Sequence, residues 1–124
     1  MAKLMTRLFD KWISKYKVPE NSLSIALNEV ANGNADANLG GNLYKKRIRF
    51  EGKGKSGSGR SIICFKKDKI AIYIHGFAKG DQENISKREL KALKEFSKVL
   101  TNLSIEQIQS AIESGDFVEV KNGK

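Results

Sequence analysis

The chain has 124 residues, of which 40% are apolar and 30% charged, and its net charge is +9. This length fits one compact domain over residues 1–124, and the apolar fraction suffices for a hydrophobic core, which excludes wholesale disorder. The chain has no apolar run long enough to cross a membrane and no signal-peptide pattern at its N-terminus, so we expect a cytoplasmic protein without a membrane partner.

The excess positive charge lies in the middle third of the chain. Residues 44–79 contain 11 basic and 2 acidic side chains, whereas residues 1–43 carry a net charge of +1 and residues 80–124 one of −1. A charge concentrated in one segment produces a local positive field, which indicates a polyanionic partner. A membrane surface would normally require an exposed apolar helix face beside the cations. Because this segment is predicted to form strands and a loop, nucleic acid is the favoured partner.

Two helices are predicted before the basic segment. Apolar side chains recur at spacings of three and four over residues 4–16, which is the pattern of an amphipathic helix. Pro19 breaks this helix, and a second helix is predicted from there to the Asn-Gly pair at residues 32–33. We expect residues 1–34 to form an antiparallel helical hairpin that packs on a sheet, and residues 34–43 to form a loop.

Residues 44–79 are predicted to form a small, mostly antiparallel sheet. The first strand, YKKRIRF over residues 44–50, alternates apolar and cationic side chains, which places Lys45, Arg47 and Arg49 on one face. A loop rich in glycine, serine and lysine, GKGKSGSG, leads from this strand into the next.

Two apolar strands follow this loop. They are predicted over residues 61–65 and 69–77, and a polar three-residue turn joins them as a hairpin. Gly76 within the third strand predicts either a bulge or a close approach of another group to the backbone.

Two capping boxes predict the starts of two C-terminal helices within residues 86–114. The boxes pair Ser86 with Glu89 and Ser104 with Gln107. Residues 117–120 are predicted to form a final edge strand. The predicted fold class is therefore α+β: an N-terminal helical hairpin packed on a small, mostly antiparallel sheet, followed by C-terminal helices.

The sequence does not indicate a metal or a cofactor. The single histidine, His75, and the single cysteine, Cys64, lie apart in a basic region with few carboxylates. The glycine-rich loop lacks the spacing of a mononucleotide-binding loop. A hydrolase with paired carboxylates is also disfavoured, because residues 44–79 contain only Glu51 and Asp68 as acidic side chains.

The remaining candidate chemistry depends on cations. RNA cleavage by transesterification requires activation of the 2′-hydroxyl, stabilisation of charge on the scissile phosphate, and protonation of the leaving 5′-oxygen. Cations on or beside the glycine-rich loop suit the second task, and a histidine or a lysine with a lowered pKa suits proton transfer. The loop cations are Lys53, Lys55 and Arg60.

Alternation predicts that Tyr73, His75 and Phe77 share one face of the third strand, with Lys79 continuing the pattern. One interpretation is that these residues belong to a functional site. The other is ordinary strand packing with a hydrogen-bonded histidine, beside loop lysines that are simply solvated. Taken alone, the strand favours ordinary packing, but the coincidence of a basic strand, a basic loop and this face in one small sheet strengthens the first interpretation.

The order of these elements resembles the RelE/HigB superfamily of bacterial toxin–antitoxin toxins. The segment that carries the resemblance is LGGNLYKKRIRFEGKGKSGSGRSIICFKKDKIAIYIHGFAKGDQENISKRELKALKEF. It is similar to a branch with a Gly-Gly-x-Leu-x-Lys-x-Arg start, a Gly-Lys-Gly-Lys-x-Gly-x-x-Arg loop, and Gly-Phe-x-Lys before an Asn-Ile-Ser helix start. The similarity is strong over residues 36–100.

The resemblance implies a compact toxin of the RelE-like fold that is an mRNA interferase. Such toxins enter the ribosomal A site and cleave the message by attack of the 2′-hydroxyl, which leaves a cyclic phosphate. It also implies three partners: mRNA, the ribosome, and a small cognate antitoxin, expected to carry a helix-turn-helix domain. The residues that match the family's loop cations are Lys53, Lys55 and Arg60, and its later active-site position falls near His75 to Phe77 with Lys79.

These arguments predict two sets of site residues. The predicted catalytic residues are Lys53, Lys55, Arg60, His75 and Lys79. The predicted RNA-binding residues are Lys45, Lys46, Arg47, Arg49 and Phe77. Two alternatives stay open: a toxin of the same fold that poisons a topoisomerase, and a non-enzymatic nucleic-acid-binding or inactive toxin-like module.

Overall fold

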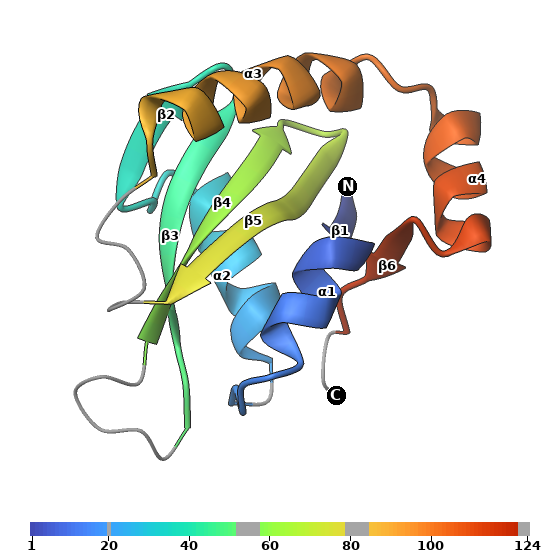
Figure 1. Ribbon diagram of the computed structural model, residues 1–124. Coiled ribbons are helices and arrows are strands. Elements are labelled where there is room, and N and C mark those ends of the chain that lie inside the picture. The colour runs from blue at the N-terminus through green and yellow to red at the C-terminus, as the bar shows by residue number, and fades with distance from the viewer. Residues whose placement is uncertain (20, 52–57, 79–84, 122–124) are drawn as a thin grey trace.

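The computed structural model describes residues 1–19, 21–51, 58–78 and 85–121. In these residues it contains strands and helices in an α+β arrangement, as the sequence predicts. In chain order the elements are β1 (Ala2–Thr6), α1 (Arg7–Ile13), α2 (Ser22–Ala31), β2 (Ala37–Gly40), β3 (Leu43–Arg49), β4 (Ser58–Lys66), β5 (Ile70–Ala78), α3 (Lys87–Thr101), α4 (Ile105–Ser114) and β6 (Phe117–Glu119) (Figure 1).

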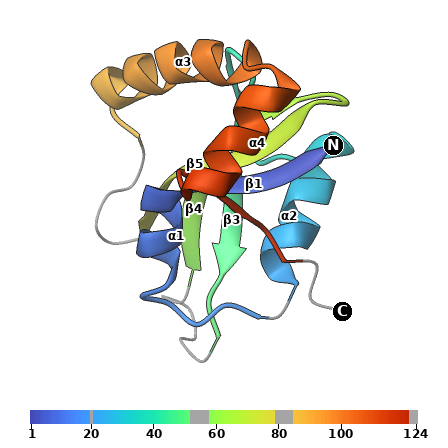
Figure 2. The same cartoon turned by 90° about the vertical axis from the view of Figure 1, so that its right-hand side faces the viewer.

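All the strands belong to one sheet in the order β2-β3-β4-β5-β1-β6. β1 runs parallel to β5, and every other neighbouring pair is antiparallel. Figure 1 shows α3 across the top of the molecule and α1 and α2 in its lower half. In Figure 2, α4 lies nearest the viewer, beside the edge of the sheet that β6 forms.

The sheet separates two hydrophobic cores. One core packs Phe9 of α1 and Leu27 of α2 against strand residues that include Tyr73. The other packs Leu100 of α3 and Ile108 of α4 against the strands. Consecutive residues of β4 alternate between the two cores, so the cores lie on opposite faces of the sheet. We call these faces the α1/α2 face and the α3/α4 face.

The prediction of a helix over residues 4–16 is wrong in its first part, so the chain does not begin with a helical hairpin. Its start is β1, in which Leu4 and Met5 face opposite cores as strand neighbours do. Thr6 then begins α1, because its Oγ1 accepts a hydrogen bond from the backbone N–H of Phe9 at 3.1 Å. Pairing with β5 and β6, which are distant in the chain, overrides the local helical spacing.

The expected loop over residues 34–43 is also partly wrong, because it contains β2. This short strand pairs with β3 through a tight turn. Gly40, Gly41 and Asn42 all have positive φ in that turn, at 83°, 61° and 65°. Glycine adopts this conformation without steric cost, which explains the Gly-Gly pair before the basic strand.

The other predicted elements are present. The second helix, the three strands of the basic segment, both C-terminal helices and the final edge strand occur close to the predicted positions. Both capping boxes form: Ser86 Oγ accepts from the N–H of Glu89, and Ser104 Oγ from that of Gln107, each at 3.1 Å. Within the described residues no helix has the length and apolar character needed to cross a membrane.

The prediction that Tyr73, His75 and Phe77 share one face is wrong. Ile62 pairs with His75 but Ile63 pairs with Tyr73, so Ile74 is an extra residue on β5. Such a bulge reverses the alternation. The Tyr73 ring therefore stacks on α1 in the α1/α2 core, whereas Phe77 belongs to the α3/α4 core.

Gly76 does not form this bulge but allows the predicted close approach. A Cβ at Gly76 would overlap the indole ring of Trp12. A Cβ at Gly59, on the neighbouring strand, would lie 2.7 Å from the ring of Phe50 and 3.0 Å from Trp12. These glycines therefore let aromatic side chains pack directly on the backbone of the α1/α2 face.

Candidate nucleic-acid interface

Three cations of β3 lie on the α3/α4 face of the sheet. Leu43 belongs to the α3/α4 core, and β3 pairs with β4 without a register shift. Alternate residues after Leu43 therefore point to the same face, and these are Lys45, Arg47 and Arg49. The intervening Ile48 belongs to the α1/α2 core. The predicted cationic face of this strand is thus present.

Arg60 of β4 lies on the same face, directly beside Arg47. Ile62 and Cys64 of β4 belong to the α3/α4 core, and Arg60 continues their alternation. The register pairs Arg47 with Arg60, and pairs Arg60 in turn with Phe77 of β5. We call the group Lys45, Arg47, Arg49 and Arg60 the cation face.

The cation face has no acidic counterpart among the described residues. Arg47 and Arg49 are exposed, and none of the four forms an ion pair with a described carboxylate. Nη1 of Arg60 is buried and has no hydrogen-bond partner among the described residues. Like charges opposite each other on neighbouring strands are destabilising, and a buried donor without a partner costs free energy. An anion between Arg47 and Arg60 would offset both costs.

His75 and Phe77 border the cation face on β5. His75 pairs with Ile62, which lies two residues after Arg60 on β4, and its side chain is 30% exposed. Its Nε2 lies 3.5 Å from Oε2 of Glu89 in α3. Phe77 is only 4% exposed and packs in the α3/α4 core, 6.0 Å from the imidazole centroid. The Phe77 ring therefore packs in the α3/α4 core, and in this structure it is not exposed for base stacking.

Lys46 lies on the opposite face from the other predicted cations. Its Nζ donates to the carbonyl of Asn34 at 2.8 Å and lies 3.5 Å from Oε1 of Glu29. Its side chain is 15% exposed. Lys46 therefore ties β3 to α2 and the segment after it, apart from the cation face.

Comparison with protein families decides the identity of the chain. A family described as "RelE toxin of RelE / RelB toxin-antitoxin system" matches residues 1–120. The chain belongs to the RelE toxin family. The match extends through α4 and β6, so the two C-terminal helices lie within the family's range. A comparison with curated proteins gives no match.

Three of the toxin's predicted site residues, Lys53, Lys55 and Lys79, lie outside the described residues. The described residues on either side of these lysines lie near Arg60. Arg49 pairs with Ser58, and Ala78 pairs with Gly59, which precedes Arg60 on β4.

Sequence reasoning missed Glu89, which lies beside His75 in this RelE-family toxin. The sequence marks it only as the second half of a capping box. Its proximity to His75 arises from the packing of α3 on the sheet, which no local pattern reveals. The only available signal was the position of the box eleven residues after the single histidine.

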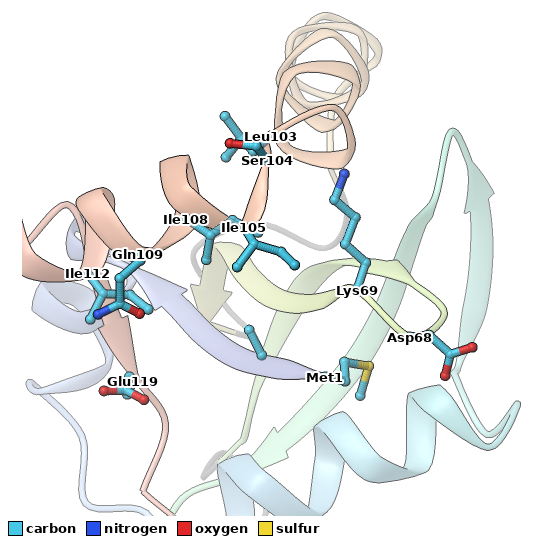
Figure 3. Close-up of a pocket in the computed structure, with 11 residues that line it drawn as sticks. Met1, Asp68, Lys69, Leu103, Ser104, Ile105, Ile108, Gln109, Ile112 and Glu119 are labelled. Atoms are coloured by element: carbon cyan, nitrogen blue, oxygen red, sulfur yellow. The ribbon is translucent and has the colours of Figure 1, made fainter.

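The toxin's cation face lies on the surface of the sheet. A hollow of about 630 Å³ lies elsewhere and is lined by Lys69, Ile105, Ile108 and neighbouring residues at the far end of the β4–β5 hairpin (Figure 3). It contains no member of the cation face. The described residues also contain no cluster of three or more histidine, cysteine or acidic side chains that could bind a metal. An open cationic surface suits an extended polyanion.

Proposed function

We propose that this RelE-family toxin is an endoribonuclease that cleaves mRNA in the ribosomal A site. In this proposal the RNA 2′-hydroxyl attacks the adjacent phosphate and leaves a cyclic phosphate. The main support is the Arg47–Arg60 pair, in which two arginines occupy directly opposite positions on neighbouring strands without an ion pair to a described carboxylate.

Two opposed arginines suit a phosphate group. Guanidinium groups donate paired hydrogen bonds to phosphate oxygens, and such charge-assisted bonds are stronger than neutral ones. Negative charge builds up on the non-bridging oxygens during transesterification, so cations at this position would stabilise the transition state. Of the two, Arg60 is the less exposed, and it pairs with Phe77 in the row next to His75.

The other members of the cation face suit RNA backbone binding. Lys45 and Arg49 lie on either side of Arg47 along β3, so an RNA strand that follows β3 meets a cation at every second residue. Contacts of this kind position a strand without reading its sequence. We propose that Lys53, Lys55 and Lys79 add further phosphate contacts from the adjoining segments.

Proton transfer is assigned to His75. It is the chain's only histidine, and it lies one row from Arg60 on the same face. Histidine transfers protons near neutral pH because its ordinary pKa lies there. The partners in this proposal are mRNA, the ribosome and a cognate antitoxin of the helix-turn-helix type. An acidic antitoxin segment on the cation face would compete directly with RNA.

The test compares Arg60→Ala with Lys67→Ala. Lys67 is an exposed cation in the turn at the opposite end of the β4–β5 hairpin, so the two variants remove the same charge from different places. We expect Arg60→Ala to lower the rate of mRNA cleavage on ribosomes by roughly 10²- to 10³-fold and to relieve growth arrest. We expect Lys67→Ala to cleave as the parent does. Cleavage sites are mapped by sequencing RNA 5′-ends.

Three results would contradict the proposed function. Growth arrest by Arg60→Ala equal to that of the parent would remove this residue from the site. DNA damage signals with intact mRNA would identify a topoisomerase poison. Salt-dependent RNA binding without cleavage on ribosomes would identify a non-enzymatic binding module.

A further inference from the structure

We propose that Glu89 of α3 is a positioning residue for His75, and that it fixes which imidazole nitrogen meets the RNA. This inference rests on the proposed function for its catalytic consequence, but not for the contact itself. Glu89 Oε2 lies 3.5 Å from Nε2 of His75, and both side chains are partly buried. The Nε2 atom itself is buried.

The carboxylate of Glu89 is held in place by its own helix. Its Oε1 accepts a hydrogen bond from the backbone N–H of Ser86 at 3.2 Å, and Ser86 Oγ accepts one from the N–H of Glu89 at 3.1 Å. The helix is anchored in turn, because Ser97 Oγ donates to the Gly41 carbonyl at 2.6 Å and Leu100 is buried in the α3/α4 core. One carboxylate thus serves both the helix cap and the histidine.

This placement leaves Nδ1 as the nitrogen for the substrate. With Nε2 buried and turned towards a carboxylate, a neutral imidazole keeps its proton on Nε2 and its lone pair on Nδ1. A carboxylate behind a histidine sets the tautomer and stabilises the imidazolium that forms during the reaction. Glu89 would therefore act on RNA only through His75.

The proton-transfer step follows from that orientation. Nδ1 of His75 accepts the 2′-hydroxyl proton while the bond between the 2′-oxygen and phosphorus forms and the bond from phosphorus to the 5′-oxygen breaks. The 5′-oxygen leaves as a hydroxyl by taking a proton from water, and the imidazolium returns its proton to water. The phosphate remains as the cyclic diester, so no other reactant is required.

The described charged groups around His75 come from three elements. Glu89 approaches from α3, while Arg60 on β4 and Lys45 on β3 lie on the same face of the sheet. In this group Glu89 supplies the carboxylate that faces Nε2, so replacing it by an amide removes the charge that favours a proton on this nitrogen.

The test uses Glu89→Gln, with Gln107→Ala as the matched control. Gln107 closes the capping box of α4 as Glu89 closes that of α3, but it does not contact His75. Because the chain has a single histidine, its imidazole signals in an NMR spectrum need no further assignment. Nitrogen-15 shifts of the neutral ring report the tautomer directly, and thermal unfolding reports the stability of each variant.

We expect the full-length parent to show the Nε2–H tautomer. In Glu89→Gln the fraction of this tautomer should fall, because a neutral amide no longer favours a proton on Nε2. The cleavage rate should fall by roughly 10-fold or more, a part of what general acid–base catalysis contributes. Gln107→Ala should lose stability without changing the tautomer or the cleavage rate.

Two outcomes separate this inference from the proposed function. An unchanged tautomer in Glu89→Gln reduces Glu89 to a helix cap and overturns the inference even if the toxin cleaves RNA. A changed tautomer in a toxin that cleaves no RNA confirms the contact, overturns its catalytic consequence, and rejects the proposed function.

Discussion

The same ends of β3, β4 and β5 have very different surroundings on the two faces of the sheet. On the α1/α2 face they carry Phe50 and Gly59, which aromatic rings cover: Tyr16 stacks on Phe50 with ring centroids 4.2 Å apart. On the α3/α4 face they carry Arg47 and Arg60, without a described counter-ion. One residue of offset along a strand separates a packed core from a charged surface.

This difference shows that stability and binding are divided between the faces. The aromatic side stabilises the fold by burying apolar area. The cation face destabilises the fold, because opposed arginines and a buried unpaired donor cost free energy until an anion binds. Substitutions on the two faces are therefore expected to affect different measurements.

The largest effect is expected from Arg47→Glu, which converts the opposed arginines into a cross-strand ion pair with Arg60. RNA cleavage should fall by roughly 10²-fold or more, because Arg60 is neutralised as well as Arg47 removed. The free energy of unfolding should rise by about 0.5 kcal/mol, as opposite charges on neighbouring strands attract. Ribosome cleavage assays and urea denaturation measure the two quantities. A variant that loses both stability and activity would contradict the division between the faces.

An intermediate effect is expected from Gly76→Ala on the aromatic side. The new methyl group overlaps Trp12, and overpacking of this kind destabilises by about 1–3 kcal/mol. The smaller ring of Trp12→Phe should make room for it, so a double-mutant cycle should show a favourable coupling energy. Independent, additive effects of the two substitutions would place the indole elsewhere.

The smallest effects are expected from two adjacent lysines on opposite faces. Lys46→Ala should lower the free energy of unfolding by about 1 kcal/mol, because it removes the hydrogen bond to the Asn34 carbonyl. Lys45→Ala should leave stability unchanged and reduce the slope of log affinity against log salt for single-stranded RNA by about 0.7. Equal changes of salt slope in both variants would mean that RNA contacts both faces.

What could be predicted from the sequence is what local patterns determine. The alternation in YKKRIRF places Lys45, Arg47 and Arg49 on one face without any knowledge of the fold, and the capping boxes fix the starts of α3 and α4. These signals depend only on residues a few positions apart.

What could not be predicted depends on distant parts of the chain. Residues 4–5 fit helical spacing equally well, and pairing with β5 and β6 makes them a strand. No glycine or proline marks the bulge at Ile74, so the change of face between Tyr73 and His75 has no local signal. Likewise, Glu89 meets the histidine because α3 packs on the sheet, which is a contact between distant parts of the chain.

The position of β1 between β5 and β6 has a consequence for synthesis of the chain. β1 is made before the other five strands of the sheet, yet its partners are residues 70–73 and 117–119. Such contacts have large sequence separation, which slows folding. While the chain emerges from a ribosome, β1 stays unpaired on both sides until β5 has been made, and its outer side stays open until β6 follows. The sheet is therefore complete only when residues 117–119 have been translated.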